Sequence, residues 1–244
     1  TGVNPDIGAE GKWYTFEYKN GEMRFTVDDN VTKTQLGVNI SKTWPVVRGW
    51  THVVGVRDMA VDSLFLYVNG MKIGSKEDLT DNDIASTLPL IIGNNHNKNN
   101  NFPGTVDDVM LYDVALTEAQ VVTLFETYDV PTRGLVAHWK LDETTGAAAA
   151  DELGNSDGTR MNMTDGLIVD GLDGKAVDFS SGADTSYITV AHNDIIDFDS
   201  TESFSASALI YIPEEPSGGY NALIKGNTGV NPDIGAEGKW YTFE

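Results

Sequence analysis

Three polar side chains in one short, glycine-containing loop have the chemistry of a cation site. The stretch AADELGNSDGT carries Asp151, Asn155 and Asp157, with Gly154 and Gly158 beside them. Ca²⁺ takes about six to eight oxygen ligands from carboxylates, amides and carbonyls, and glycine lets a loop turn tightly around the ion. The same residue types also close Asx turns on their own backbone. The loop therefore predicts either a calcium site or a set of tight turns.

A second candidate is the segment GNNHNKNNNFPG, which places six asparagines, one histidine and one lysine within residues 94–101. An asparagine amide donates and accepts hydrogen bonds, as sugar hydroxyls do. Loops at the rim of a scaffold often carry ligand contacts. We expect Asn95, His96, Asn97 and Asn99 to contact a glycan. The alternative, a solvated polar turn between two strands, stays open.

Aromatic rings could add a stacking surface for sugars. Trp44 stands before Pro45, and Trp13 has an identical twin in Trp240. We expect these three tryptophans to be partly exposed, with Trp44 as the candidate ligand contact. A half-buried tryptophan on a sandwich needs no ligand, so this interpretation has a plain structural alternative.

Other site chemistry has little support in the sequence. There is no cysteine, which excludes a disulfide framework, a thiolate zinc site and a thiol nucleophile. A serine nucleophile elbow and a paired-histidine zinc motif are also missing. The four histidines, which we expect to be structural, are scattered along the chain: His52, His96, His138 and His192.

Charge and length limit the partners further. The 244 residues include 37 acidic and 16 basic side chains, for a formal net charge of −21. Such a surface repels phosphate backbones and anionic membranes, so nucleic acid and lipid are poor partners. No apolar run is long enough to span a bilayer, and we expect neither membrane insertion nor a signal peptide at the N-terminus.

The elements that must position these residues are mostly strands. Asn20-Gly21 and Asn69-Gly70 each separate two runs of alternating apolar residues, which is a strong hairpin signal. Further strands are predicted in GWTHVVGVRD, TLPLIIG, TVDDVMLYDV, GLVAHWKLD, SYITVA and SFSASALIYI. Their number and spacing predict an all-β sandwich of two antiparallel sheets.

One segment, LTEAQVVTLFETY, has a helical pattern. Thr117 and Gln120 form a capping-box pair at its start, and Val121, Leu124 and Phe125 share one apolar face. We expect a short helix packed on the sandwich. The stretch after it, YDVPTRG at residues 128–134, has the composition of a linker.

Several motifs resemble the laminin-G-like, concanavalin A-like jelly-roll modules of bacterial extracellular proteins. GLVAHWKLDETTG and DELGNSDGT are similar to the opening strand and loop of that family, and GLDGKAVDFSSGADTSYITV to its second signature. SFSASALIYI is similar to its first long core strand. GWTHVVGVRD, LFLYVNGMKIGS and FPGTVDDVMLYDVALTEAQV are similar to its later elements, and together these motifs cover almost the whole chain.

This resemblance implies an extracellular or cell-surface module with Trp50 and Trp139 in its core. It also implies that Asp151, Asn155 and Asp107 lie near a structural calcium. Glucanases of this fold carry an E-x-D-x-x-E triplet on one strand, and the acidic clusters KEDLTDND and VDDV lack that spacing. We therefore expect no enzymatic activity.

The motifs occur in a circularly rotated order relative to the family, and the chain begins and ends with the same 17-residue segment. Residues 228–244 repeat residues 1–17, TGVNPDIGAEGKWYTFE, without a substitution. We interpret residues 1–130 as the C-terminal part of a module, 131–133 as a linker and 134–244 as the N-terminal part. The repeat unit is then 227 residues long. A window from a tandem array and an engineered circular permutant both explain this order.

These observations lead to one functional expectation and one alternative. The first is a non-catalytic extracellular module of a tandem-repeat surface protein, mediating adhesion or carbohydrate binding to a glycan or surface protein. The second is a structural repeat that builds a filament, stalk or surface layer by exchanging strands with neighbouring copies. Whether the two halves meet within one chain or between chains stays open.

Overall fold

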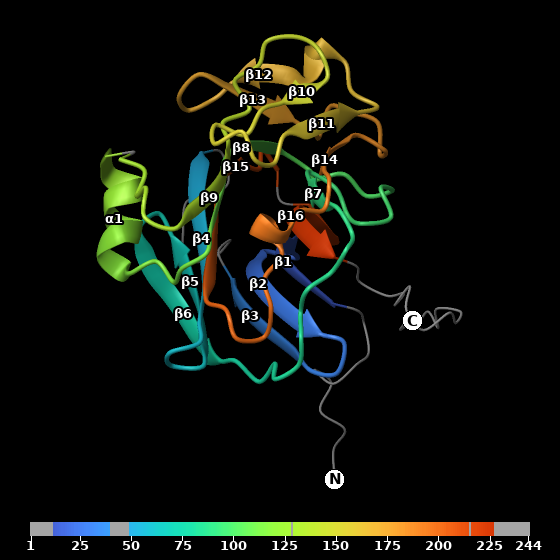
Figure 1. The fold of residues 1–244 in the computed structure, drawn as a ribbon. Helices are drawn as coiled ribbons and strands as arrows, with labels where there is room; N and C mark the ends of the chain where they lie inside the picture. Colours follow the sequence, from blue (N-terminus) through green and yellow to red (C-terminus); the bar gives the residue numbers. More distant parts are fainter. Residues whose placement is uncertain (1–11, 40–48, 128, 215, 227–244) are drawn as a thin grey trace, which may run out of the picture.

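The computed structural model describes residues 12–39, 49–127, 129–214 and 216–226. Over these residues the fold is an all-β sandwich of two antiparallel sheets with one α-helix, as the sequence predicts (Figure 1). Two single-turn 3₁₀ helices, η1 (Asp165–Leu167) and η2 (Asp194–Ile196), lie in the connections. None of the described helices is long and apolar enough to cross a membrane.

Sheet A has eight described strands, and it contains both the first and the last strand of the described chain. In spatial order they are β10 (Ala148–Ala149), β11 (Gly158–Met161), β14 (Tyr187–Val190), β7 (Leu90–Ile92), β16 (Gly219–Gly226), β1 (Lys12–Lys19), β2 (Glu22–Asp29) and β3 (Lys33–Asn39).

Sheet B is formed mainly from the middle of the chain. In spatial order its strands are β12 (Ile168–Asp170), β13 (Lys175–Asp178), β8 (Thr105–Tyr112), β15 (Phe204–Tyr211), β4 (Trp50–Asp58), β5 (Ser63–Val68) and β6 (Met71–Glu77), with β9 (Leu135–Trp139) also pairing with β8.

The two Asn-Gly turns lie where the sequence predicts them. Asn20 and Gly21 have φ angles of 50° and 84°, and Asn69 and Gly70 have 48° and 75°. Positive φ at both positions is what a two-residue type I′ turn requires, and asparagine and glycine tolerate it best. These turns fix the register of β1 against β2 and of β5 against β6.

The core lies between the sheets and is dominated by aromatic rings. Phe16 and Phe25 of sheet A are fully buried, with ring centroids 5.4 Å apart. Phe204 of sheet B contacts Phe25 at 5.9 Å and Phe198 at 4.6 Å. Because side chains alternate between the two faces of a strand, each sheet presents one continuous apolar face to the other.

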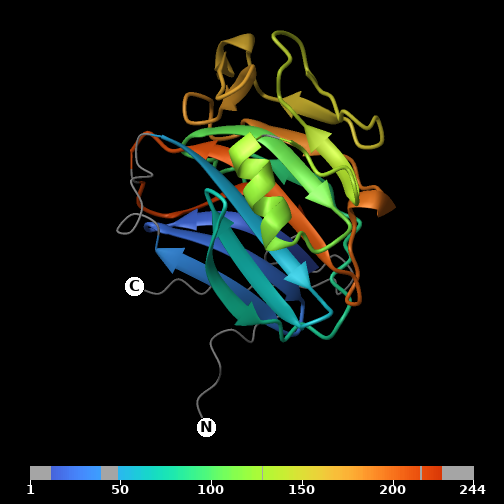
Figure 2. The same cartoon turned by 90° about the vertical axis from the view of Figure 1, so that its left-hand side faces the viewer.

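Helix α1 (Glu118–Thr127) lies on the outer face of sheet B (Figure 2). Gln120 accepts a hydrogen bond from the Thr117 backbone N–H at 2.9 Å, and the Thr117 hydroxyl accepts one from the Gln120 N–H at 3.3 Å. This is the predicted capping box. Val121 and Leu124 are buried against the sheet, so the predicted packing of a short helix on the sandwich is confirmed.

Strands from the two sides of residues 131–133 are interleaved in both sheets. In sheet B, β15 pairs with β4 on one side and β8 on the other. In sheet A, β16 pairs with β7 and β1. The part of the chain before the predicted linker therefore shares one core with the part after it.

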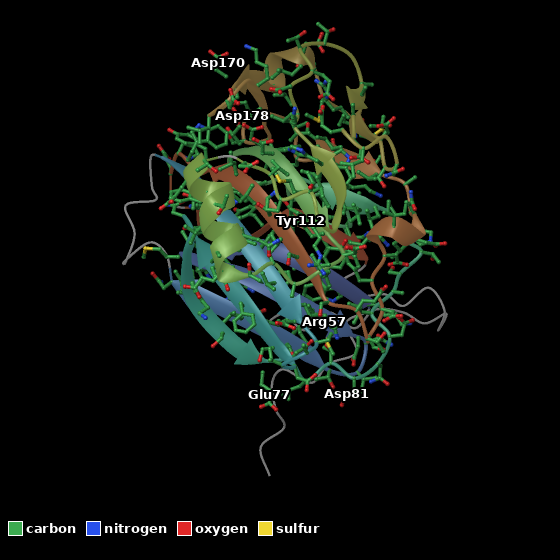
Figure 3. All side chains as sticks on the ribbon, turned by 60° about the vertical axis from the view of Figure 1, so that its left-hand side comes forward. Arg57, Glu77, Asp81, Tyr112, Asp170 and Asp178 are labelled. Atoms are coloured by element: carbon green, nitrogen blue, oxygen red, sulfur yellow. The ribbon has the colours of Figure 1, made fainter. Side chains whose placement is uncertain are left out.

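A buried ion pair closes one end of the sandwich. The Arg57 and Asp78 side chains are 0% and 1% exposed, and Arg57 Nε donates to Asp78 Oδ2 at 2.7 Å. The guanidinium also donates to the backbone carbonyls of Asp199 at 2.8 Å and Ser200 at 3.1 Å. Figure 3 places Arg57 toward one end of the molecule and Asp170 at the opposite end.

Candidate functional site

The predicted calcium loop forms tight turns in which both Asp151 carboxylate oxygens accept backbone hydrogen bonds. Oδ1 accepts from the N–H of His138 at 2.8 Å and Leu153 at 3.1 Å. Oδ2 accepts from the N–H of Asn155 and of Ser156, both at 3.0 Å. These hydrogen bonds are those expected if the loop forms tight Asx turns, the alternative to a calcium site.

Asp157 and Asn155 belong to the same loop but point to different partners. Asp157 Oδ1 accepts from the backbone N–H of Asp151 at 2.9 Å. The Asn155 side chain is exposed, and its backbone carbonyl accepts from the Asn193 amide at 2.8 Å. The loop is therefore held together by its own carboxylates.

Asp107 lies in a different group of residues. It is on β8, fully buried, and its Oδ1 accepts from the Asp108 backbone N–H at 2.9 Å. Its Oδ2 has no partner of good hydrogen-bond geometry among the described residues, although the Leu172 backbone N–H is near enough to the carboxylate to lower its pKa. A Cβ atom at Gly171 would lie 2.5 Å from Oδ2, so only glycine leaves room for the carboxylate there.

Charge around Asp107 is strongly negative. Burial, followed by the carboxylates of Asp108 and Asp142, raises the pKa of Asp107 to about 8. Asp142 also accepts a hydrogen bond from the Lys175 backbone N–H at 2.6 Å, and Asp108 Oδ1 lies 2.8 Å from His138 Nε2. The sequence did not point to Asp142 or Gly171, because only the fold brings three separate segments together at Asp107.

A buried carboxylate oxygen without a well-placed partner could take a proton or serve as one ligand of a cation. Within the described ranges, however, no three His, Asp or Glu side chains converge in an arrangement that would hold a metal ion. Backbone carbonyls or water would have to complete an oxygen shell around Asp107.

In the asparagine-rich loop, three side chains anchor the segment to the sandwich. The Asn94 amide donates to the carbonyls of Asp184 and Ser186 at 2.8 and 2.9 Å. Asn100 donates to the Gly219 carbonyl at 2.7 Å, and Asn101 to that of Phe179. Three of the six asparagines in this loop are therefore explained by hydrogen bonds that hold the loop in place.

The predicted ligand residues lie at the tip of the same loop. The Asn95 amide donates to the Asn99 side-chain carbonyl at 2.8 Å, so these two asparagines bond to each other. Asn97 is exposed, whereas His96 is half-buried. The Lys98 ammonium lies 5.5 Å from the centre of the Tyr187 ring, an aromatic neighbour that the sequence pattern did not identify.

The exposure of the described tryptophans agrees only in part with the sequence-based expectation. Trp44 lies outside the described residues. Trp13 is only 6% exposed, so the expected partial exposure is wrong; both faces of β1 are covered, since Tyr14 and Thr15, which point to opposite faces, are each 2% exposed. Trp139 is fully buried, as expected, and donates to the Ser156 carbonyl at 2.7 Å, whereas Trp50 is half-buried.

A histidine and a serine form a further polar pair on the outer face of sheet B. His52 Nε2 lies 2.9 Å from Ser207 Oγ, and the two residues are 5% and 1% exposed. Burial lowers the pKa of His52 to about 4, and its ring stacks on Phe125 of α1 at 6.1 Å. The pair is enclosed by the helix and does not face a substrate.

Comparison with known proteins agrees with this architecture. Residues 4–122 match a laminin G-type family model described as the concanavalin A-like lectin/glucanases superfamily. No curated protein matches the chain. The matched segment includes β1 to β8, which contribute four strands to each sheet, but not β15 and β16 from the middle of the two sheets. Residues 4–122, just under half of the chain, are therefore similar to the concanavalin A-like lectin/glucanase superfamily, and the two-sheet sandwich of the described residues agrees with that similarity.

Proposed function

We propose that this chain is a non-catalytic extracellular module of a tandem-repeat surface protein, and that it mediates adhesion or carbohydrate binding. The observation that carries the proposal is the superfamily match on a two-sheet sandwich. The fold alone does not define a ligand, so the site argument rests on the exposed loops.

The state of the carboxyl groups supports a binding role over glycoside hydrolysis. A hydrolytic acid needs a raised pKa and access to the glycosidic oxygen. Among the described carboxyl groups with a resolved shift, Asp107 alone has a raised pKa, and it is fully buried. Glu17 and Glu22 in sheet A are held by Arg24, at 3.4 and 2.7 Å.

We place the glycan contact at the tip of the loop formed by residues 95–99. Asn97 offers an exposed amide, and Lys98 and Tyr187 supply a charged donor above an aromatic ring. Asn95 and Asn99 bond to each other, so they shape the tip and leave Asn97 to carry most of the direct hydrogen bonding.

On a glycan array, Asn97→Ala is expected to weaken binding to the recognised sugar about tenfold, the effect of losing one to two hydrogen bonds. Thr123→Ala is the control, because Thr123 is exposed on α1 on the outer face of sheet B. No signal for the unmodified chain, or equal binding by both variants, would contradict a glycan site at this loop.

We further propose that Asp107 binds a structural calcium ion together with nearby oxygens, Asp142 among them. A cation would give the buried Oδ2 a partner and offset the repulsion between neighbouring carboxylates. The ion would tie β8 to residues 142 and 171–175. It would serve stability, since this group lies apart from the asparagine-rich loop.

Calcium at about one hundred times its Kd is expected to raise Tm by roughly 5–10 °C over protein in excess chelator. Asp107→Asn should remove most of this increase. Asp170→Asn, which alters an exposed ion pair with Lys175, should keep it. Identical melting with calcium and with chelator would eliminate the site.

The duplicated segment favours the structural repeat as a second candidate function. Identical copies at residues 1–17 and 228–244 are what a window from a tandem array would contain. Filaments of a multi-repeat chain in negative-stain micrographs, without glycan binding, would support this alternative.

A further inference from the structure

Strand β1 fills an interior position of sheet A, between β16 and β2. Against β16, Trp13 pairs with Gly226 and Phe16 with Leu223. Against β2, Phe16 pairs with Phe25. Both edges of β1 are thus hydrogen-bonded to neighbouring strands.

The side chains of β1 fit this position closely. Tyr14 and Phe16 are 2% and 0% exposed, and Phe16 packs on Phe25. The Tyr14 hydroxyl donates to the Ile196 carbonyl at 2.9 Å, and the Thr15 hydroxyl donates to the Leu223 carbonyl at 2.5 Å. A segment must supply these side chains in this order to fill the position equally well.

The chain contains a second segment that does so. Residues 239–244 read KWYTFE, identical to residues 12–17, so Tyr241 and Phe243 correspond to Tyr14 and Phe16. Residues 227–238 connect this copy to the end of β16. A loop of about this length costs little closure entropy. A strand that follows β16 after such a connection would run antiparallel to it, which is the direction in which β1 pairs with β16.

We propose that residues 239–244 of this chain can replace residues 12–17 between β16 and β2, so that one sheet position accepts either copy. The two copies differ in their tether. The N-terminal copy continues through Tyr18 and the Asn20-Gly21 turn into β2, whereas the C-terminal copy continues from β16.

This exchange goes beyond the proposed function, since it requires no ligand. Because only one of the two identical segments can occupy this position at a time, the other segment is not used there. The segment left over has the sequence that fits the same position in another copy of the module. The position between β16 and β2 is therefore the joint through which successive copies can connect.

A substitution cycle at the two equivalent phenylalanines tests the exchange. Phe16→Asp places a carboxylate in the core and should lower Tm by only a few degrees, because the C-terminal copy takes over. Phe243→Asp alone should leave Tm unchanged. The double variant should lose roughly 10 °C or more, as expected for losing a core phenylalanine.

Without exchange, Phe16→Asp alone would be as destabilising as the double variant, and the proposal would be overturned. The milder pair Phe16→Ala and Phe243→Ala repeats the comparison if the aspartate variants do not fold. The ordering of single and double variants is the same in both series.

An engineered disulfide can identify which segment lies in the sheet. The chain has no cysteine of its own, so any disulfide must form between the introduced residues. Thr15 is the register partner of Ile224, so Thr15→Cys with Ile224→Cys should form a disulfide in the otherwise unchanged chain. In a Phe16→Asp background, Thr242→Cys with Ile224→Cys should form the equivalent bond within one chain on a non-reducing gel.

Adding Phe243→Asp to that background should abolish the second disulfide, because the C-terminal copy then no longer fits. A disulfide that links two chains would assign the occupant to a second copy and overturn the assignment to the same chain. No disulfide in the Phe16→Asp background would exclude the exchange.

Discussion

Replacing Arg57 with methionine is expected to lower the free energy of unfolding by about 3–5 kcal/mol, because it leaves a buried carboxylate without its partner. The Asp78 side chain is 1% exposed, and water cannot replace the 2.7 Å contact without entering the core. The carbonyls of residues 199 and 200 would lose their donor as well. Urea unfolding, followed by tryptophan fluorescence, measures the change.

Arg24→Met is the matched control, since it removes an arginine from a cluster that water can still partly reach. The Arg24 side chain is 17% exposed and its partners Glu17 and Glu22 are 22% and 38% exposed. Such pairs contribute about 1 kcal/mol or less. Similar losses in the two variants would show that the buried pair has no special role in closing the end of the sandwich.

In excess chelator, the chain is expected to lose stability as the pH rises toward 8, and Asp107 is the cause. Its pKa is about 8 in the folded protein against 3.8 in the unfolded chain. Between these values the folded state holds a proton that the unfolded state has lost. Stability therefore falls with rising pH, by up to about 1.4 kcal/mol per pH unit.

Asp107→Asn should flatten this slope between pH 6.5 and 8, as followed by urea unfolding at each pH. His52 does not interfere there, because its lowered pKa destabilises the fold only as the pH falls from 6.5 toward about 4. Saturating calcium should flatten the slope too, since it holds the carboxylate ionised. Parallel slopes for both proteins would assign the pH dependence to other groups.

Local sequence patterns predicted the elements whose structure is determined locally. Both Asn-Gly turns and the capping box of α1 appear as expected. The sequence analysis did not predict strand β16 (GYNALIKG), because apolar and polar residues do not alternate along it. It lies in the interior of sheet A, between β7 and β1. Its neighbours, which the local pattern does not contain, determine its conformation.

The sequence could suggest which residue types form the candidate cation site, but not how their side chains are arranged. The sequence pointed to Asp151, and the family resemblance to Asp107, as candidate oxygen ligands, yet neither could show that Asp151 accepts hydrogen bonds from four backbone N–H groups. Nor could it place Asp142 near Asp107, since these residues come from separate strands and loops. Burial of Trp13 likewise depends on the cover over its face of β1, which the local sequence does not contain.

The pairing of β1 with β16 also determines when this fold can form during synthesis. The Thr15 hydroxyl bonds to the Leu223 carbonyl, 208 residues away. At about 5–20 residues per second, a ribosome needs roughly 10–40 s to make that intervening chain. Throughout this interval Phe16 and Phe25 have no opposing sheet complete enough to bury them. Sheet A of a nascent chain therefore cannot be completed until β16 emerges, and pairing over so long a separation is expected to form slowly.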